Sequence, residues 1–396
     1  MQSHFNPPSR WQLLALVALV LFSPLAIDIY LPALPQMANS FGVSDVLAQD
    51  TITWFLFAMG VGQIFAGPLA DKLGRRTVAL AGITIYGLSA CLAWAAQSIE
   101  WMLMARLLQG LGACATSVAA FATVRDIFGP QRSGKMISYL NGAICFIPAL
   151  APILGSWLTS QFGWRSNFSF MAAFALVIGA VVMLNLKETN QTPTNTQVFK
   201  LSRYGEVLKS PIFVFHATLC MLAMAVILGY VTSAPVILMG EMSLSMSAFT
   251  YWFAINAVFN IIACLIAPKI MDKVGTRKTI IMGISILLSA GALMLILAPL
   301  KSAASFMLPI ILCSVGFAFV LGASAGKALA PFGDKAGTAS ALLGLFQMSG
   351  AGLIIGTVQR LHLDTTTMMA LLMWLLLPGL LVLLSKTAKH WHEVTC

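Results

Sequence analysis

The stretch GPLADKLGRRT, Gly67–Thr77, lies between two apolar segments, and a weaker copy, APKIMDKVGTRKT, lies at Ala267–Thr279. The copies are 201 residues apart, which is about half of the 396-residue chain. The matched pairs are Asp71 with Asp272, Lys72 with Lys273, Gly74 with Gly275, Arg76 with Arg277 and Gly82 with Gly283. One short match can arise by chance, but its occurrence at the same place in both halves indicates an internal repeat.

The composition places these turns in a membrane protein. Hydrophobic residues make up 59% of the chain, charged residues make up 9%, and the mean hydropathy is +0.89, whereas a soluble domain carries about 25% charged residues. A membrane-spanning helix needs about 20 apolar residues and satisfies its own backbone in lipid. The chain holds twelve such runs, at residues 11–34, 50–70, 77–96, 101–124, 135–157, 166–186, 211–234, 247–268, 279–299, 304–326, 337–357 and 366–386. The sequence therefore predicts an all-α membrane protein with twelve transmembrane helices in two pseudo-symmetric six-helix bundles.

A long polar stretch, Glu188–Ser210, separates the two halves. We expect an N-terminal six-helix bundle at residues 1–187, a cytoplasmic linker at residues 188–209 and a C-terminal six-helix bundle at residues 210–396. The first apolar run is too long for the core of a signal peptide and contains an acid, so we interpret it as an uncleaved first span.

Lysine and arginine are divided unequally between alternate loops. Of the 23 basic residues, 19 fall on one side of the predicted helices, and three, Arg165, Lys301 and Arg360, fall on the other. The remaining one, Arg106, lies inside a predicted span. Because the more basic loops stay in the cytoplasm, we expect both termini to be cytoplasmic. The sequence pI is near 9.4, but the positive charge lies in short loops rather than on one face, so we expect no nucleic-acid partner.

One carboxylate, Asp28, lies well inside an apolar run. A charge at such a depth costs roughly 2.5–3.5 kcal/mol on insertion scales, and it is usually kept to carry a proton, an ion or a substrate. Asp28 and Arg106, in the first and fourth runs, each lie on the order of 8 Å below the outer ends of their helices. Burial favours a neutral carboxyl group and a nearby cation favours the charged form, so we predict that Asp28 exchanges a proton at physiological pH. The alternatives are a static ion pair between Asp28 and Arg106 and a mainly structural Arg106.

Other classes of protein find no support in the sequence. The seven cysteines and five histidines lack metal-ligand spacing, and the spans hold no nucleophile with a base partner, as an enzyme would need. A channel would require rings of charge or a filter loop, and no nucleotide-binding loop of the form GxxxxGKS or GxxxxGKT occurs. Internal repeats are typical of secondary transporters. We therefore expect a transporter and not an enzyme, with no metal or cofactor and with the proton gradient as its energy source.

Four segments resemble the motifs of a known family. They are PLAIDIYLPALPQM (Pro24–Met37), GPLADKLGRR (Gly67–Arg76), LMARLLQGLGAC (Leu103–Cys114) and PALAPILGSW (Pro148–Trp157). The chain resembles the major facilitator superfamily, in particular its twelve-helix drug:proton antiporter branch and the bicyclomycin/chloramphenicol resistance group of bacterial multidrug exporters. The resemblance implies the major facilitator fold, a bacterial inner-membrane location, and proton-coupled antiport of small amphipathic drugs by alternating access. Export of one metabolite, such as an amino acid derivative or a nucleoside, and uptake by symport remain alternatives.

The resemblance also implies roles for single residues. Asp28 and Arg106 would face a central cavity and couple transport to protons, and Arg75 would pair with Asp126. Asp71 would cap the N-terminus of a helix, although the charges of this loop could serve only to fix the topology. The implied conformational gate consists of Gly67, Asp71, Gly74, Arg75, Arg76 and Asp126. We expect Gly67 and Gly74 to permit close helix approach and a sharp turn.

The remaining implied sites concern coupling and substrate. Pro148, Pro152 and Gly155 form the antiporter motif of the fifth span, which would make this helix bendable or simply kinked. Ala151 and Ser156 stand where the fuller motif has glycine, and Thr276 stands opposite Arg75 in the second loop. Candidate substrate contacts are Tyr30, Gln109, Asn141, Tyr251 and Asn256. With 21 methionines, an adaptable apolar pocket is expected. The expected partners are the small-molecule substrate, protons and the lipid bilayer, and the expected state is a monomer.

Overall fold

The computed structural model describes residues 9–190, 201–361, 363–385 and 389–392, and these residues contain no β-strand. The first half is formed by α1 (Arg10–Asp28), α2 (Leu34–Phe41), α3 (Asp45–Leu73), α4 (Arg75–Ala95), α5 (Ile99–Phe162) and α6 (Ser166–Asn185). The second half contains α7 (Leu201–Leu208), α8 (Pro211–Pro235), α9 (Met246–Val274), α10 (Thr276–Leu297), α11 (Ala303–Leu329), α12 (Ala336–Leu345), α13 (Ala351–Gln359), α14 (Thr365–Trp374) and α15 (Leu377–Leu384). Within the described residues, twelve helical segments are long and apolar enough to cross a membrane, which confirms the predicted number.

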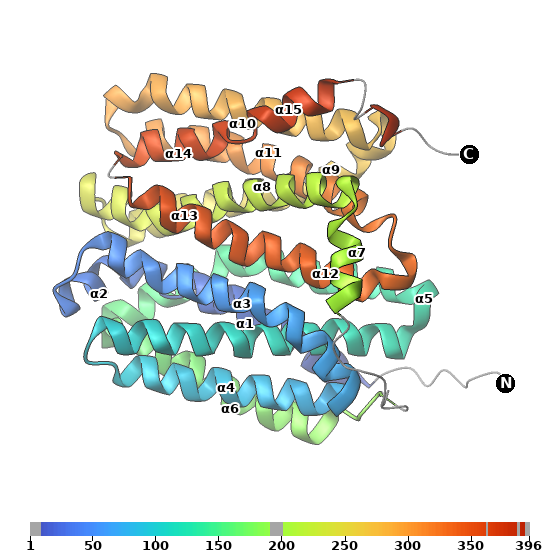
Figure 1. Cartoon of the computed structure of the whole chain (residues 1–396). Coiled ribbons are helices and arrows are strands. Elements are labelled where there is room, and N and C mark those ends of the chain that lie inside the picture. Colours follow the sequence, from blue (N-terminus) through green and yellow to red (C-terminus); the bar gives the residue numbers. More distant parts are fainter. Residues whose placement is uncertain (1–8, 191–200, 362, 386–388, 393–396) are drawn as a thin grey trace.

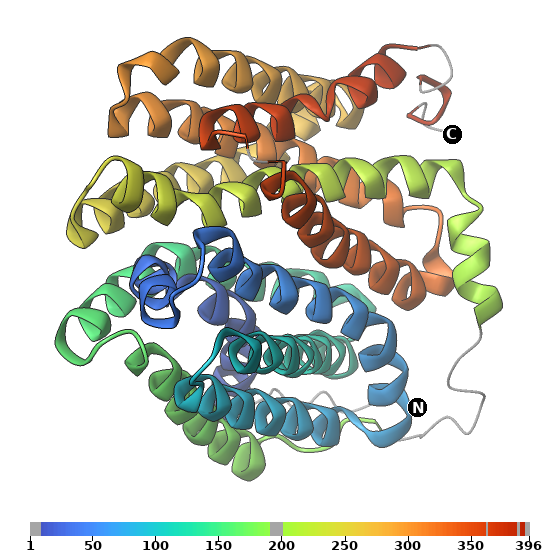
Figure 2. The same cartoon turned by 60° about the vertical axis from the view of Figure 1, so that its left-hand side comes forward.

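The helices form two bundles that lie side by side (Figures 1 and 2). Helices α1 to α6 make one bundle and α8 to α15 make the other, as predicted, while the short helix α7 lies across one end of both. The bundles meet along α3 with α12 and α13, and along α5 with α9. The exact borders at residues 187, 188, 209 and 210 stay a prediction, because residues 191–200 of the linker lie outside the described residues.

The repeated turn has the same backbone conformation in both halves. Gly74 (φ 98°, ψ 151°) and Gly275 (φ 85°, ψ 157°) each immediately precede a helix, α4 and α10. Only glycine adopts such angles readily. The arginine two residues after each glycine donates a hydrogen bond to a backbone carbonyl group near the end of the last span of its own half. Arg76 Nη2 donates to Met183 O of α6 (2.7 Å), and Arg277 Nε donates to Leu383 O of α15 (3.0 Å). The repeat seen in the sequence is therefore a repeat in structure.

A second pair of glycines repeats the close packing of neighbouring helices. A methyl group on Gly82 would lie 2.9 Å from Gly112 O, and one on Gly283 would lie 2.9 Å from Gly316 O. Small residues at these crossings allow α4 to pack against α5, and α10 against α11, backbone to backbone. These contacts explain why the two halves resemble each other beyond the loop motif.

The first span is interrupted directly after Asp28. Helix α1 ends at Asp28, a 3₁₀ turn follows at Leu31–Ala33, and α2 continues to Phe41. Pro32 has no N–H with which to continue the helical hydrogen bonds, so the helix breaks here. The predicted end of this span, residue 34, is wrong because the chain resumes as a helix beyond the turn. Asp28 therefore lies 13 residues, rather than six, before the end of the span.

Helical structure continues through the predicted loop between the fourth and fifth spans. Helical structure runs from Ile99 to Phe162 and is broken inside by the backbone of Gly129 (φ 66°, ψ 178°). The two spans are Ile99–Gly129 and Tyr139–Phe162, so each ends five residues after the apolar run that predicted it, at residue 129 rather than 124 and at residue 162 rather than 157. A polar helix end costs little at a membrane surface, which is why hydropathy alone places such borders too early.

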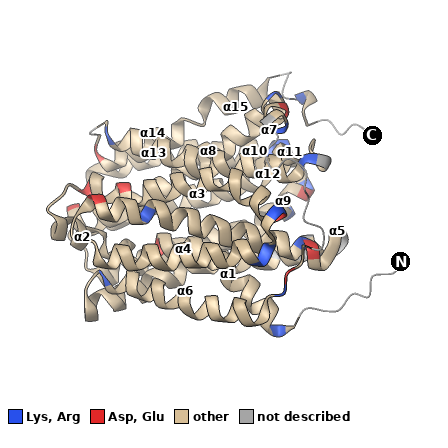
Figure 3. Cartoon of the chain, turned by 60° about the horizontal axis from the view of Figure 1, so that its bottom comes forward, with Lys and Arg blue, Asp and Glu red and all other residues tan. Residues whose placement is uncertain are grey.

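The two ends of the molecule differ in charge. We call the end that carries Gly74 and Gly275 the turn end. Figure 3 shows most of the lysines and arginines there, near α7, whereas several acids lie at the opposite end. This separation agrees with the unequal division of basic residues between the loops.

Candidate functional site

Arg106 is held inside the first bundle by three helices. Its side chain is fully buried, and it lies on α5. Nε donates to Thr51 O of α3 (3.2 Å), Nη2 donates to Ala26 O of α1 (2.9 Å), and Nη1 donates to Gln109 Oε1. The guanidinium also lies over the rings of Tyr30 (4.8 Å) and Phe55 (4.5 Å). Carbonyl oxygens and aromatic faces thus stabilise its charge.

Asp28 lies at a similar depth in the bundle to Arg106 but does not form an ion pair with it. Arg106 contacts Ala26, two residues before Asp28, which supports the predicted similarity in depth. None of the ion pairs among the described residues joins Asp28 to Arg106. The structure therefore does not support the alternative of a static ion pair between Asp28 and Arg106. Asp28 is 4% exposed, and no cation of the described residues forms an ion pair that would hold its carboxyl group permanently charged.

The second bundle supplies the other wall around Asp28. Tyr230 of α8 is buried and lies close enough to interact with both Asp28 and Asn256. Asn256 of α9 accepts a hydrogen bond from Ser314 Oγ of α11 (2.9 Å), and the ring of Tyr230 stacks on Phe253 (5.4 Å between centroids, 16° between planes). The sequence reasoning missed Tyr230. The criterion that selected Tyr30, a tyrosine in a span expected to line the cavity, would have found it.

The predicted substrate contacts separate into two groups. Tyr30, Gln109 and Asn256 are buried in the cluster around Arg106 and Tyr230. Tyr30 shares a hydrogen bond with Thr51 Oγ1 (2.8 Å), so it and Gln109 already support Arg106. Asn141 and Tyr251 are exposed, and none of the contacts between described residues joins them to this cluster.

Residues of the gate motif form a polar network at the turn end. Arg75 Nε lies 3.0 Å from Asp126 Oδ2, which is the predicted ion pair, and Arg75 Nη1 also pairs with Asp71 Oδ1. Thr189 Oγ1 donates to Asp126 Oδ2 (3.1 Å), and Asn190 Nδ2 donates to Asp71 O (2.6 Å). The network therefore ties the ends of α3 and α5 to the segment after α6.

The helix cap at this end comes from Glu188 rather than from Asp71. Glu188 carboxylate oxygens accept the backbone N–H groups of Arg75 (2.8 Å) and Arg76 (3.1 Å), the first residues of α4. Burial opposes the charge of Glu188, but the N–H groups of Asn190, Arg75, Arg76 and Thr189 outweigh it and hold its pKa below the ordinary value of 4.5. The prediction for Asp71 was wrong, and the sequence reasoning missed Glu188, whose only signal was its place at the end of the sixth span.

The two glycines of the gate motif behave differently. A methyl group on Gly74 would overlap the carboxylate of Glu188, in addition to the strain at its positive φ. A methyl group on Gly67 would meet nothing within 4 Å. The close helix approach predicted at Gly67 is therefore wrong, because no helix in the described part of the chain comes within contact distance of such a methyl group.

The antiporter motif lies on α5 against the turn that follows Asp28. A methyl group on Gly155 would overlap the carbonyl oxygen of Ile29 and lie 2.7 Å from its carbonyl carbon. Pro148 and Pro152 lie within the helical segment Tyr139–Phe162, and the only non-helical backbone angles described inside α5 are at Gly129. The motif thus brings α5 close to Asp28, with no local break in the helix at its prolines.

An ion pair that the sequence did not suggest joins the bundles at the end opposite to the turns. Arg360 Nη2, after α13, lies 2.6 Å from Asp50 Oδ2 of α3. Gln49 Nε2 donates to Thr232 O of α8 (3.2 Å) beside it. Nearer the middle of the molecule, Ser349 Oγ donates to Phe57 O (2.6 Å). Asp50 was missed because it is the first residue of the predicted run 50–70, whereas α3 begins at Asp45.

Comparison with known proteins identifies the family. The sequence profile of the Major Facilitator Superfamily matches residues 16–355. The chain belongs to this superfamily. It is 33% identical over 370 residues to the Multidrug resistance protein MdtL of Shewanella oneidensis, with 91% of each chain covered. It is 32% identical over 360 residues to the protein of the same name from Salmonella heidelberg, with 90% of each chain covered.

Solved structures support the fold. A mutant form of the peptide transporter POT in complex with sulfate superposes with a TM-score of 0.79 at 14% identity, covering 99% of this chain and 96% of that chain. The human organic anion transporter MFSD10 (TETRAN) superposes with a TM-score of 0.69 at 17% identity, covering 96% of this chain and 100% of that chain. Together with the family match, these comparisons confirm the predicted major facilitator fold and a transporter rather than an enzyme.

Proposed function

We propose that this protein is a proton-driven antiporter that exports small amphipathic drugs through the inner membrane of a bacterium. The similarity to multidrug resistance proteins supports the substrate class. The charge separation supports cytoplasmic termini, with the turn end facing the cytoplasm. The proposed unit is a monomer that needs no cofactor, because the proton gradient supplies the energy.

The observation that carries the proposal is the buried, unpaired Asp28 between the two bundles. A carboxylate without a cation in an apolar interior is costly, and protonation removes that cost. Asp28 therefore favours a proton when it is enclosed and releases it when it meets water on the cytoplasmic side. Arg106 keeps its own charge, because carbonyl groups and aromatic rings surround it. Its role is to set the polarity and geometry around Asp28.

In this mechanism the substrate binds next to the carboxyl group that takes up the proton, so substrate binding and protonation of Asp28 compete. Tyr230 of the second bundle interacts with both Asp28 and Asn256, so a substrate that binds beside Asp28 would contact both halves. Most of the buried polar groups in this region are already hydrogen-bonded to one another, which suits recognition of a substrate by shape and hydrophobicity rather than by many directed hydrogen bonds. Tyr30 and Gln109 act mainly through Arg106.

The polar network at the turn end acts as a conformational lock. Asp71, Arg75, Asp126 and Glu188 hold the cytoplasmic ends of α3, α4 and α5 together, so that the first bundle moves as one body. Asp71→Ala is expected to lower turnover more than substrate binding. A variant with the wild-type transport rate would leave these charges with only a topological role.

The test uses purified protein in liposomes with an imposed pH gradient and a panel of compounds. Asp28→Asn is expected to abolish gradient-driven export while the protein still inserts and folds. Asp45→Asn, which changes an exposed acid at the start of α3, is the matched control and should keep activity. Full activity of Asp28→Asn would refute the assignment, and transport of a single metabolite from the panel would replace the multidrug substrate class.

A further inference from the structure

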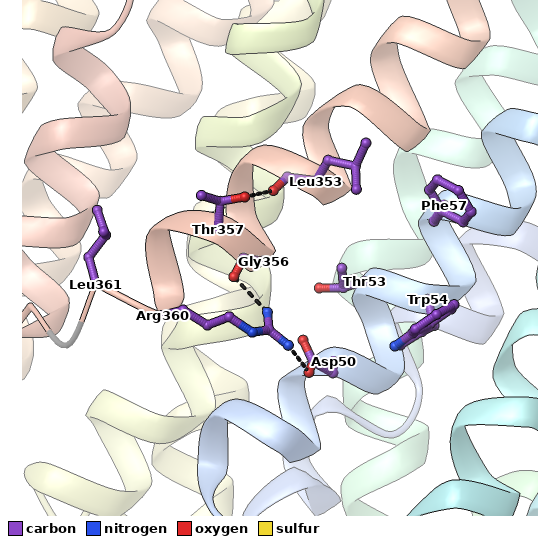
Figure 4. Close-up of a pocket in the computed structure, with 9 residues that line it drawn as sticks. All are labelled: Asp50, Thr53, Trp54, Phe57, Leu353, Gly356, Thr357, Arg360 and Leu361. Carbon is purple, nitrogen blue, oxygen red and sulfur yellow. Dashed lines mark hydrogen bonds and ion pairs between the residues drawn. The ribbon is translucent and has the colours of Figure 1, made fainter.

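A groove opens between the two bundles at the end of α3 that is opposite to the turns (Figure 4). We call it the outer groove, since this end faces outward in the proposed orientation. It has a volume of about 540 Å³. Its lining consists of Asp50, Thr53, Trp54 and Phe57 of α3 and of Leu353, Gly356, Thr357, Arg360 and Leu361 in and after α13. The lining thus combines one acid, one base, two threonines and apolar residues.

The charged end of the groove is asymmetric. The side chain of Asp50 is 3% exposed, whereas that of its partner Arg360 is 56% exposed. Arg360 Nη2 binds Asp50 Oδ2 and Nη1 donates to Gly356 O (2.7 Å). These contacts use two of the five N–H groups of a guanidinium, so the exposed side of Arg360 can bind an anion without breaking the pair.

Two buried oxygen atoms in the groove have no hydrogen-bond partner among the described residues. They are Asp50 Oδ1 and Thr53 Oγ1. Figure 4 shows both atoms pointing into the space between α3 and α13. A buried carboxylate oxygen without a donor is unfavourable, so this place suits a ligand that brings N–H groups.

The rest of the groove is mainly apolar, and its side chains are partly exposed. Trp54 and Leu353 are 41% and 55% exposed. Along α3, Asp50 lies about 8 Å from the start of the helix and Phe57 about 10 Å further in, at 1.5 Å per residue. The charged end thus lies at the depth of lipid headgroups and the apolar walls at the depth of acyl chains. A tryptophan at this border is typical of the membrane interface.

We propose that the outer groove binds a phospholipid of the outer leaflet that carries a phosphoethanolamine headgroup. Its ammonium N–H groups bind Asp50 Oδ1 and Thr53 Oγ1, its phosphate binds the exposed side of Arg360, and an acyl chain lies along Trp54 and Leu353. An acid and a base side by side match a headgroup with both charges. A choline headgroup has no N–H donor, and a glycerol headgroup has no positive charge for Asp50.

The bound lipid contacts both halves of the molecule. Asp50 and Thr53 belong to the first bundle, whereas Leu353 and Arg360 belong to the second. Occupation of the groove therefore stabilises the arrangement of the bundles seen in this structure. This inference depends on the orientation of the chain in the membrane and not on which substrate is transported.

The test measures lipid binding to the purified full chain in detergent, by native mass spectrometry and by thermal stabilisation. The lipids have the same acyl chains and differ only in headgroup: ethanolamine, its N-methyl and N,N-dimethyl forms, choline and glycerol. Affinity is expected to fall stepwise with each methyl group and to be roughly tenfold weaker for choline, because the charged hydrogen bonds are lost. Equal binding of the choline or the glycerol lipid would overturn the proposal.

Variants locate the site. Thr53→Val keeps the Asp50–Arg360 pair and removes one ligand oxygen, and Arg360→Gln removes the phosphate contact. Each is expected to weaken ethanolamine-lipid binding several-fold, whereas Lys301→Gln, which changes an exposed base on the same side outside the groove, is expected to have no effect. Wild-type affinity in folded Thr53→Val and Arg360→Gln proteins would place the lipid elsewhere and refute the inference.

Discussion

The substitution Gly155→Ala is expected to push α5 away from the turn that holds Asp28. In the structure the backbone of Ile29, the residue after Asp28, lies directly against Gly155. The added methyl group would overlap Ile29 O, lie 2.7 Å from Ile29 C and lie 3.2 Å from Asn167 Oδ1. Backbone atoms cannot rotate away as a flexible side chain can, so the helices themselves must separate.

The size of the effect follows from this overlap. Ordinary contacts of a methyl carbon begin near 3.4 Å, and Ile29 O lies far inside that limit, so α5 and the end of α1 must move apart by roughly 2 Å. Overpacking of this kind costs at least about 1–3 kcal/mol. A loss of this size lowers the unfolding temperature of a domain of the size of one bundle by roughly 2–12 °C. Because Asp28 lies beside the displaced carbonyl group, gradient-driven transport should fall along with stability.

Thermal unfolding in detergent and transport in liposomes measure the two effects. Gly142→Ala is the matched control, because it lies on the same helix and a methyl group there meets nothing within 4 Å. It should keep wild-type transport and lose no stability, since alanine favours a helix. If Gly155→Ala and Gly142→Ala were equally stable and equally active, the close contact between α5 and the Asp28 turn would not exist as described.

Three further predictions concern other parts of the molecule. The pKa of Glu188 is lower in the folded protein than its ordinary value of 4.5. The ionised carboxylate therefore stabilises the fold fully above pH 4.5, and this stabilisation is lost as the pH falls through the lower pKa of the folded state. Glu188→Gln should remove this part of the pH dependence of thermal unfolding. The thiols of Cys145 and Cys264, on α5 and α9, are within hydrogen-bonding reach. Oxidation should therefore cross-link the halves and slow transport reversibly, whereas unchanged free thiols would contradict this contact. Arg106→Lys cannot reach both Thr51 and Ala26 carbonyls, so transport should fall at least roughly tenfold, while an active variant would show that only the charge matters.

Much of the architecture could be predicted because it depends on local sequence. Apolar runs of helix length gave the twelve spans, and the spacing of Gly74 and Gly275 gave the repeated turn. The pair between Arg75 and Asp126 was predictable because both residues end spans on the same side. Borders were less accurate, since Ser44 caps the N-terminus of α3 through Leu47 N (3.3 Å) and starts the helix before its apolar run.

The rest of the site depends on contacts between distant segments. Tyr230 faces Asp28, and Arg360 pairs with Asp50 across 310 residues of chain. No pattern within one helix shows which residue a neighbouring bundle will bring against it. Likewise, Glu188 replaces Asp71 as the cap of α4 because the chain returns to that helix end after α6, which only the fold determines.

The central claim is that Asp28 carries the proton that drives export. The most direct measurement records substrate efflux and proton uptake at the same time, in liposomes containing either wild-type protein or Asp28→Asn. We predict that the wild type takes up protons as substrate leaves and stops when the gradient is collapsed, and that Asp28→Asn shows no substrate-dependent proton movement. Proton uptake coupled to substrate efflux in Asp28→Asn would contradict the account.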